Sequence, residues 1–198
     1  MNEPSGNAAV ILASASPRRK YLLRQAGLAF AVEVSRVDES SIPWSAPQPY
    51  TRALAEAKAA DVADRHPDAW IIGADTIVVA GGKGLEKPGS RDEARQMLTR
   101  LSGAVHEVYT GYALLCRHRD HHYVDTVRTE VRFKELSAEE IEWYIHTREP
   151  YDKAGAYAIQ GLGTFLVREI RGSYTNVVGL PVCEVLDHLR QNRVIRRQ

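Results

Sequence analysis

The stretch Trp70–Ala80 (WIIGADTIVVA) constrains the fold of this chain more than any other. It is an apolar run rich in Ile and Val that ends at Gly81 and Gly82, a pattern typical of a β-strand. Apolar residues occupy both alternating sets of positions, so we expect both faces to be covered, as in the centre of an α/β sheet. Asp75 interrupts the run. Because a buried carboxylate is costly unless it is paired or bound to a metal, either Asp75 reaches a cleft or the strand ends at Ala74.

The other segments alternate between strand and helix patterns, which indicates an α/β fold with a mixed twisted sheet flanked by helices. Helices are expected after the N-terminal signals at Ser16, Ser90, Ser137 and Pro181, and Ser90–Glu93 and Ser137–Glu140 read as capping boxes. A further helix is expected over 50–65, after a loop containing Pro43, Pro47 and Pro49. The remaining strands are expected over 10–13, 32–35, 108–116, 123–133 and 163–170, with a short apolar link over 177–180.

Composition indicates a globular protein of ordinary character. The 198 residues are 44% hydrophobic and 26% charged, enough for one domain of two lobes without a separable linker, and we expect loose termini over 1–9 and 191–198. The formal net charge of +1 argues against a general nucleic-acid coat. No apolar run is long enough to span a membrane, and no basic segment opens the chain, so we expect the cytoplasm, with Cys116 and Cys183 as free thiols.

A candidate anion site follows the first strand. Ser16 suits an N-cap and Pro17 the first helical position, so backbone N–H groups and the positive end of a helix dipole are expected beside Ser14, Arg18 and Arg19. Phosphate is the anion most often held in this way. The alternative is a plain capped helix whose arginines are solvated.

Carboxylates and cations recur along the chain in numbers that suit phosphate chemistry. Such a site needs carboxylates to hold Mg²⁺ or Mn²⁺ and orient a water, and cations to stabilise charge on phosphoryl oxygens. The candidates are Asp38, Glu39 and Asp75 with Arg18, Arg19, Lys58, Lys87 and Lys153. No phosphate-binding Gly-x-x-x-x-Gly-Lys-Ser/Thr loop and no Gly-x-Gly-x-x-Gly after a strand occurs. The residues alone therefore predict only a metal-assisted phosphate-site enzyme.

Two candidates have plainer interpretations. Lys58 lies one turn beyond Leu54 on a small-residue helix face, and a solvated lysine with its stem along that face would account for it. Lys153 and Gln160 lie in a segment, 149–161, without helical or strand periodicity. That segment suits a loop pressed against a ligand, or a structural loop turning at its glycines.

Many short stretches, in order, match those of one protein family. They are LASASPRR (12–19), DE (38–39), EAKA (56–59), GADT (73–76), KP (87–88), LSG (101–103) with His106, TG (110–111), EP (149–150), DKAGAY (152–157), IQG (159–161), GSY (172–174) and VVGLP (177–181). On these residues the chain resembles the Maf family of nucleoside triphosphate pyrophosphatases, from about Val10 to Leu189.

The resemblance implies hydrolysis between the α and β phosphates with a divalent cation, in a two-lobed Maf/ITPase-like fold with a central cleft, often as a homodimer. It implies Asp75 as general base and Glu39 as metal ligand beside Asp75, with Lys58 and Lys87 on the phosphates. Ser14, Arg18 and Arg19 would hold the triphosphate, and Thr76, Lys153 and Gln160 would complete the substrate site.

Arg18, Thr76 and Gln160 match the branch acting on dTTP and UTP, whereas the 7-methyl-GTP branch differs at the last two positions. Modified pyrimidine triphosphates suit the same branch. Strict alternation sends Asp75 and Thr76 to opposite faces of a strand, so both reach a cleft only if the strand ends or bulges there. Two other function classes are a nucleotide-binding regulator of septum formation and, less consistent with the balanced charge, a nucleic-acid binder.

Overall fold

The structure, a computed structural model, describes residues 9–195. Its centre is a seven-stranded mixed sheet in the order β2-β1-β3-β5-β6-β7, with β4 paired to the end of β3. β1 is parallel to β2 and β3, and the other neighbours are antiparallel. The strands are β1 (Val10–Leu12), β2 (Ala31–Val32), β3 (Trp70–Ala80), β4 (Lys83–Leu85), β5 (Val105–Cys116), β6 (His121–Phe133) and β7 (Val167–Arg171). The mixed sheet predicted from the sequence is confirmed.

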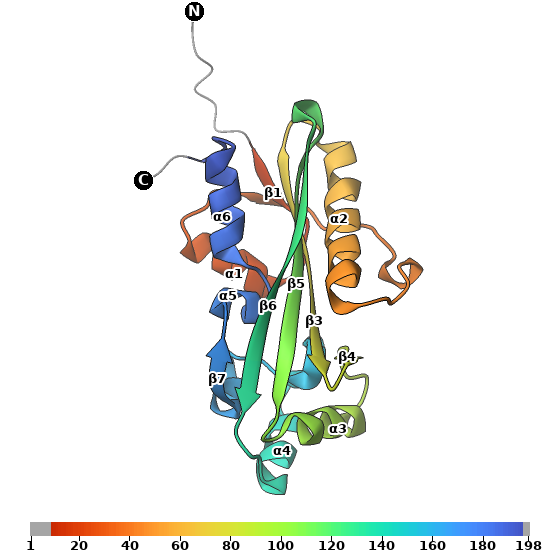
Figure 1. Ribbon diagram of the computed structural model, residues 1–198, viewed down its shortest axis with the longest axis vertical. Coiled ribbons are helices and arrows are strands. Elements are labelled where there is room, and N and C mark those ends of the chain that lie inside the picture. The colour runs from red at the N-terminus through yellow and green to blue at the C-terminus, as the bar shows by residue number, and fades with distance from the viewer. Residues whose placement is uncertain (1–8, 196–198) are drawn as a thin grey trace, which may run out of the picture.

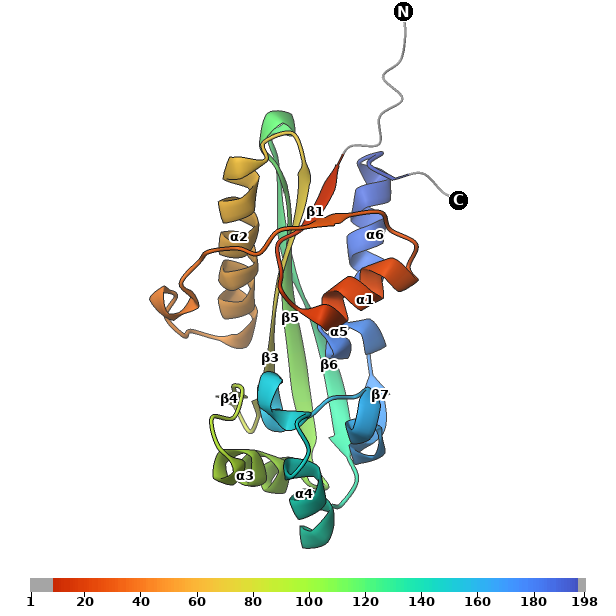
Figure 2. The same cartoon turned by 180° about the vertical axis from the view of Figure 1, so that it is seen from behind.

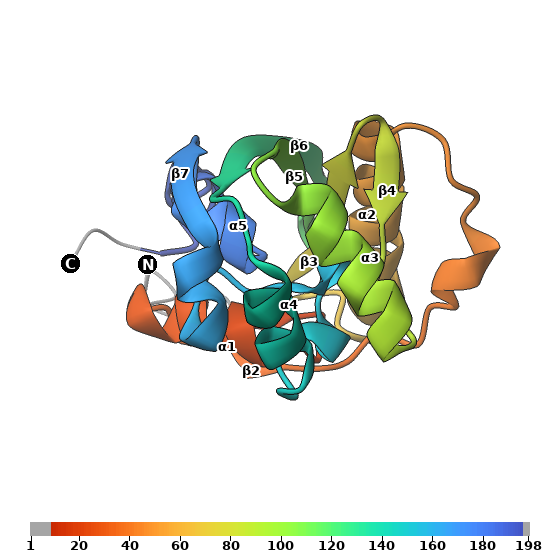
Figure 3. The same ribbon diagram turned by 90° about the horizontal axis from the view of Figure 1, so that it is seen from below.

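Helices cover the sheet from two sides and close one end of it. Figure 1 shows α2 on one side of the long strands, α1, α5 and α6 on the other, and α3 and α4 at the lower end. Seen from below, α3 and α4 lie next to each other across that end (Figure 3). The helices are α1 (Pro17–Gln25), α2 (Pro47–Arg65), α3 (Arg91–Leu101), α4 (Ala138–Ile145), α5 (Tyr174–Val178) and α6 (Val182–Gln191).

The predicted helix starts are largely confirmed. The Ser16 hydroxyl accepts from the Arg19 N–H, and Ser137 with Glu140 forms a complete capping box. At α3 only half of the box is present: Ser90 accepts from the Glu93 N–H, but the Glu93 carboxylate accepts from the Gly89 N–H instead. Pro181 is the N-cap of α6 rather than its first residue.

Four predicted segments were wrong. β2 is Ala31–Val32 rather than a strand over 32–35. α2 begins at Pro47 rather than Tyr50, because the first-turn N–H groups of a helix have no partner within the helix and prolines are tolerated there. Residues 161–166 form a 3₁₀ segment, η5 (Gly161–Leu166), so the last strand is shorter than predicted. The apolar link over 177–180 is partly helical, since Val177 and Val178 end α5.

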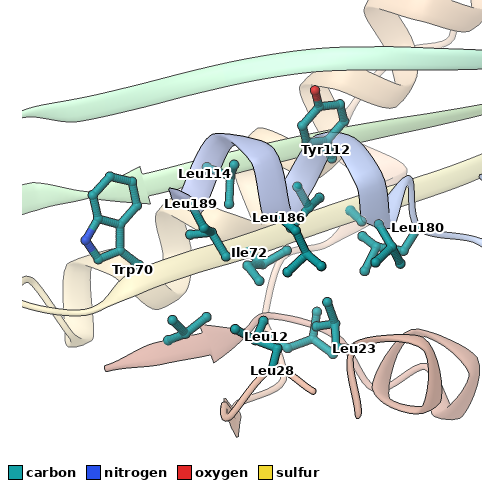
Figure 4. Packing of buried hydrophobic residues seen from close by; sticks show 14 of the residues in the cluster. Leu12, Leu23, Leu28, Trp70, Ile72, Tyr112, Leu114, Leu180, Leu186 and Leu189 are labelled. Atoms are coloured by element: carbon teal, nitrogen blue, oxygen red, sulfur yellow. The ribbon is translucent and has the colours of Figure 1, made fainter. Parts of the chain in front are cut away.

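The core is divided into two lobes along β3. On one face, Trp70, Ile72 and Ala74 pack with α1 and α6, as Figure 4 shows for several members of this cluster. Farther along the same face, Val78 and Ala80 pack with residues of α3 and α4. The apolar packing on β3 is therefore interrupted at position 76, between the two clusters.

The opposite face shows the same interruption one residue earlier. Ile71 packs against the alanine face of α2, and Ile77 and Val79 pack with Tyr109, so Asp75 stands between two clusters. The central cleft of a two-lobed fold follows from these two gaps in the core.

Two glycines allow α2 to lie directly on the sheet. A Cβ on Gly73 would lie 2.2 Å from the Ala55 carbonyl oxygen, and a Cβ on Gly111 would lie 2.2 Å from that of Thr51. Gly111 is also the cross-strand partner of Asp75. The close approach brings Lys58, which follows on α2, within reach of the strand that carries Asp75.

Part of the expectation of loose termini, residues 1–8 and 196–198, lies outside the described residues. Within the described part of 191–198, Gln191 ends α6 and Val194 is buried at 2% exposure. None of the helices in residues 9–195 is both long and apolar enough to cross a membrane.

Candidate active site

One cavity of about 710 Å³ opens where the core is interrupted. It is lined from both lobes and by every site residue that the family resemblance implies, whereas Asp38, a further candidate from the sequence, does not line it. The site residues that line it are Ser14, Arg18, Arg19, Glu39, Lys58, Asp75, Thr76, Lys87, Lys153 and Gln160. The alternative in which β3 ends at Ala74 and Asp75 begins a turn is wrong, because β3 continues to Ala80.

Asp75 and Thr76 reach the cavity from opposite faces of an unbroken strand. Their pairing with Gly111 and Thr110 of β5 continues through this point without a register shift. β1 instead ends at Leu12, opposite Ile72, and β4 joins β3 only at Val78. One edge of β3 is therefore open between these neighbours, and the cavity reaches both faces there. The prediction that β3 must end or bulge at this point was wrong.

On the Asp75 side, Lys58 joins two carboxylates. Its Nζ atom lies 2.7 Å from Asp75 Oδ1 and 2.8 Å from Glu39 Oε1. The Lys58 and Asp75 side chains are only 11% and 15% exposed, so this pair is held within the protein. Glu39 is 57% exposed and begins η1 (Glu39–Ser41), whose N-cap Asp38 accepts from the Ser40 N–H at 3.0 Å. The interpretation of Lys58 as a solvated lysine was wrong.

On the Thr76 side, a buried arginine ties three parts of the chain together. Arg19 donates through Nε to the Gly179 carbonyl at 2.7 Å, through Nη1 to Ser14 Oγ at 3.0 Å and through Nη2 to Thr76 Oγ1 at 3.2 Å. Thr76 Oγ1 also lies 2.8 Å from the Thr110 hydroxyl. These contacts fix the start of α1 against β3.

Arg19 is a buried cation whose hydrogen-bond partners in the described part of the chain are all neutral groups. The residue is 8% exposed, and no carboxylate of residues 9–195 forms an ion pair with it. Burial lowers the pKa of its guanidinium, and the field of Asp75 opposes that effect. A buried cation with neutral partners that lines a cavity is suited to an anionic ligand.

A third group of charges lies on the loop before η5. Arg18 Nη1 lies 3.1 Å from Asp152 Oδ2, and the Lys153 ammonium pairs with the same carboxylate while donating to the Glu149 carbonyl at 2.7 Å. Burial by itself would raise the pKa of Asp152. The contacts with Lys153 and Arg18 lower this pKa by more than burial raises it, so the net pKa lies below its usual range. Sequence reasoning missed Asp152, although its place beside Lys153 was a signal.

Lys87 and Gln160 complete the lining without contacts of their own. Within residues 9–195 neither side chain has a hydrogen-bond partner, and Lys87 is exposed on the loop between β4 and α3. Both are therefore available to a ligand in the cavity.

Glu39 and Asp75 suit a hard divalent cation whose remaining ligands come from the substrate phosphates. No group of three or more His, Cys, Asp or Glu in the described part of the chain could hold a metal. Glu39 and Asp75 nevertheless converge on one point, now occupied by Lys58 Nζ. Mg²⁺ is commonly held by one or two carboxylates together with substrate phosphates, so this oxygen-only pair fits Mg²⁺ or Mn²⁺.

Comparison with known proteins identifies similar chains. A family model described as Maf-like protein matches residues 9–192. The chain is 50% identical over 181 residues to the dTTP/UTP pyrophosphatase of Syntrophus aciditrophicus, covering 91% of this chain and 88% of that one. It is 52% identical over 182 residues to the dTTP/UTP pyrophosphatase of Geotalea uraniireducens, covering 92% and 94%. Among solved structures, a HAM1 protein from Coxiella burnetii aligns over 81% of this chain and 80% of its own, with a TM-score of 0.43 and 12% identity, too weak a likeness to argue from.

Proposed function

The chain belongs to the Maf family, and from this premise we propose that it hydrolyses dTTP and UTP to the nucleoside monophosphate and pyrophosphate. Relatives that are about 50% identical over nine-tenths of the chain carry that activity in their names. The observation that carries the proposal is the paired carboxylate and ammonium of Asp75 and Lys58. They share one cavity with the buried Arg19, which has no ion-pair partner within residues 9–195.

The cavity contains positive groups suited to the triphosphate and carboxylates suited to the attacking water. Arg18, Arg19, Lys87 and Lys153 supply positive groups for the triphosphate, in a site that buries part of that charge. Electrostatic groups fixed before the reaction stabilise charge as it develops on the leaving pyrophosphate. The carboxylates of Asp75 and Glu39 meet at Lys58 Nζ in the same cavity.

In the proposed reaction Asp75 orients a water molecule and accepts its proton while the water oxygen bonds to the α-phosphorus. The bond from that phosphorus to the oxygen bridging to the β-phosphate breaks, and pyrophosphate leaves with the bonding electrons. Lys58 turns from the carboxylates to the phosphoryl oxygens that gain charge. Glu39 and Asp75 would hold a divalent cation, which when bound supplies Lewis-acid stabilisation of those oxygens.

The pyrimidine preference rests on Arg18, Thr76 and Gln160, which match the dTTP and UTP branch. Thr76 and Gln160 both line the cavity, and the Gln160 amide, which has no partner among residues 9–195, can pair with a base edge. A cytoplasmic location and a homodimer belong to the same proposal.

Product analysis tests the proposal. Purified protein is incubated with dTTP and Mg²⁺ or Mn²⁺, and the phosphorus products are resolved by nuclear magnetic resonance, with UTP, modified pyrimidine triphosphates and 7-methyl-GTP in parallel. We expect dTMP and pyrophosphate in equal amounts. Formation of dTDP and phosphate would rule out cleavage between the α and β phosphates, faster turnover of 7-methyl-GTP would overturn the pyrimidine assignment, and tight binding of dTTP without turnover would indicate a nucleotide-binding regulator.

A further inference from the structure

The segment 149–163 brings Lys153 and Gln160 into the cavity, and the half-buried carboxylate of Glu149 links the two ends of this segment. Figure 2 shows this segment crossing in front of the sheet between α1 and α4. Lys153, Ala158 and Gln160 line the cavity, whereas Tyr144 of α4 and Glu149 do not.

Glu149 joins the two ends of the segment. Its Oε1 atom accepts from the Gly163 N–H at 2.7 Å and from the Tyr144 hydroxyl at 2.8 Å, and its Oε2 atom accepts from the Leu162 N–H at 3.0 Å. A Cβ on Gly161, whose φ is +70°, would lie 2.3 Å from Oε2. The backbone therefore closes tightly around this carboxylate.

Tyr144 connects the carboxylate to the cavity side of the segment. Its side chain is fully buried, and its hydroxyl also accepts from the Ala158 N–H at 3.2 Å. A Cβ on Gly163 would lie 2.6 Å from the same hydroxyl oxygen. One phenol thus fixes the Glu149 carboxylate and the residue two positions before Gln160.

The backbone of Glu149 contacts Lys153, the second cavity residue of this segment. Its carbonyl accepts from Lys153 Nζ at 2.7 Å, and its N–H donates to the Thr147 hydroxyl at 3.2 Å. Lys153 is therefore tied to the backbone of Glu149, and the backbone two positions before Gln160 is tied to Tyr144.

We propose that Tyr144 and Glu149 are positioning residues that hold Lys153 and Gln160 against the bound nucleotide without touching it. This inference rests on the proposed function, since it concerns the substrate of that reaction. Asp75, Lys58 and Glu39 lie on other elements, so disturbing this pair weakens nucleotide binding more than it slows the chemical step.

The test uses Glu149→Gln and Tyr144→Phe. In Glu149→Gln an amide NH₂, which is a donor, faces one of the backbone N–H groups that now donate to the carboxylate, so that hydrogen bond is lost. In Tyr144→Phe the ring is kept and the hydroxyl is removed. For each variant we expect KM for dTTP to rise on the order of 10-fold, as for one or two displaced hydrogen bonds, with kcat within about 3-fold of wild type. The dissociation constant for dTTP measured by calorimetry should rise in parallel.

Matched controls separate positioning from general loss of stability. Glu140→Gln makes the same change in the capping box of α4, and Tyr109→Phe removes a phenol that donates to Glu107 at 3.1 Å. Both should lower the melting temperature and leave KM unchanged. In a Gln160→Ala background, Tyr144→Phe should raise KM by less than it does in the wild type, because the two residues act through one segment.

Unchanged KM and dissociation constant in folded Glu149→Gln and Tyr144→Phe would overturn the inference, as would a loss confined to kcat or equal effects in both backgrounds. If wild-type protein bound dTTP without releasing pyrophosphate, the proposed function would fail, and the dissociation constants of the same variants would still decide whether the pair positions the nucleotide.

Discussion

Lys58 Nζ lies 2.7 Å from Asp75 Oδ1, and this contact depends on a residue that has no side chain. Gly73 shares a strand face with Asp75, and the helix that carries Lys58 passes directly over it. The functional pair and the packing of α2 on the sheet are therefore one structural feature.

Replacing Gly73 should disturb both. In Gly73→Ala the new Cβ would meet the Ala55 carbonyl at 2.2 Å, so α2 must shift, which we expect to cost about 2 kcal/mol of unfolding free energy. Turnover of dTTP should fall as well, because Lys58 moves with the helix. Urea unfolding and steady-state kinetics measure the two effects. Gly89→Ala is the control, since its Cβ meets nothing closer than 3.5 Å; similar behaviour of the two variants would refute the account.

Lys58→Met removes the ammonium that joins the two carboxylates. We expect kcat to fall on the order of 10²-fold, the usual effect of losing one group that stabilises charge in a transition state. Lys83→Met, at an exposed position of β4, should keep wild-type kinetics. A Lys58→Met enzyme within threefold of wild type would exclude Lys58 from the reaction.

Because of Arg19, the folded protein should be stabilised by pyrophosphate, the leaving group of the proposed reaction. Pyrophosphate compensates a buried cation that lacks an ionic partner within residues 9–195, so it should raise the melting temperature of the wild type. Arg19→Met should abolish that rise, whereas Arg24→Met, exposed on the same helix, should retain it. Equal stabilisation of all three proteins, measured by differential scanning fluorimetry, would place the anion elsewhere.

His106 should make stability depend on pH. The residue is 1% exposed, its Nε2 lies 2.8 Å from the Tyr157 hydroxyl, and burial lowers its pKa from 6.5 to about 4. The unfolded chain therefore binds more protons between these values, and stability falls as pH decreases from 6.5 towards 4. His106 alone accounts for about 3 kcal/mol of this loss at most.

The variant His106→Phe isolates the contribution of His106 to the pH dependence of stability. It should be less stable at pH 7.5, because the Tyr157 hydroxyl loses its partner, yet show a shallower decline below pH 6.5. Burial also lowers the pKa of His121 and His188, which leaves a residual slope of the same sign. Urea unfolding at several pH values checks this, and an unchanged slope would contradict it.

Local sequence predicted most of the elements, since the apolar run Trp70–Ala80, the cap at Ser16 and the capping box at Ser137 each depend on neighbours in the chain. It failed where the answer depends on distant segments. Access to Asp75 and Thr76 from both faces of β3 depends on where β1 and β4 stop, which no pattern within the strand reveals.

The same limit applies to the residues around the site. Asp152 accepts a hydrogen bond from Arg18, which lies 134 positions away in the chain. Glu149 accepts hydrogen bonds from backbone N–H groups at the other end of a loop. A carboxylate in irregular backbone gives no local sign of such partners. The family resemblance supplied the site residues that spacing could not.

The turnover of Asp75→Asn, measured beside its affinity for dTTP, tests the central claim most directly. The amide keeps the size of the side chain but cannot accept the proton of the attacking water. We predict that release of pyrophosphate falls on the order of 10³-fold while the calorimetric dissociation constant for dTTP changes by less than about 10-fold. An Asn variant that turns over dTTP at a rate near that of the wild type would contradict the account.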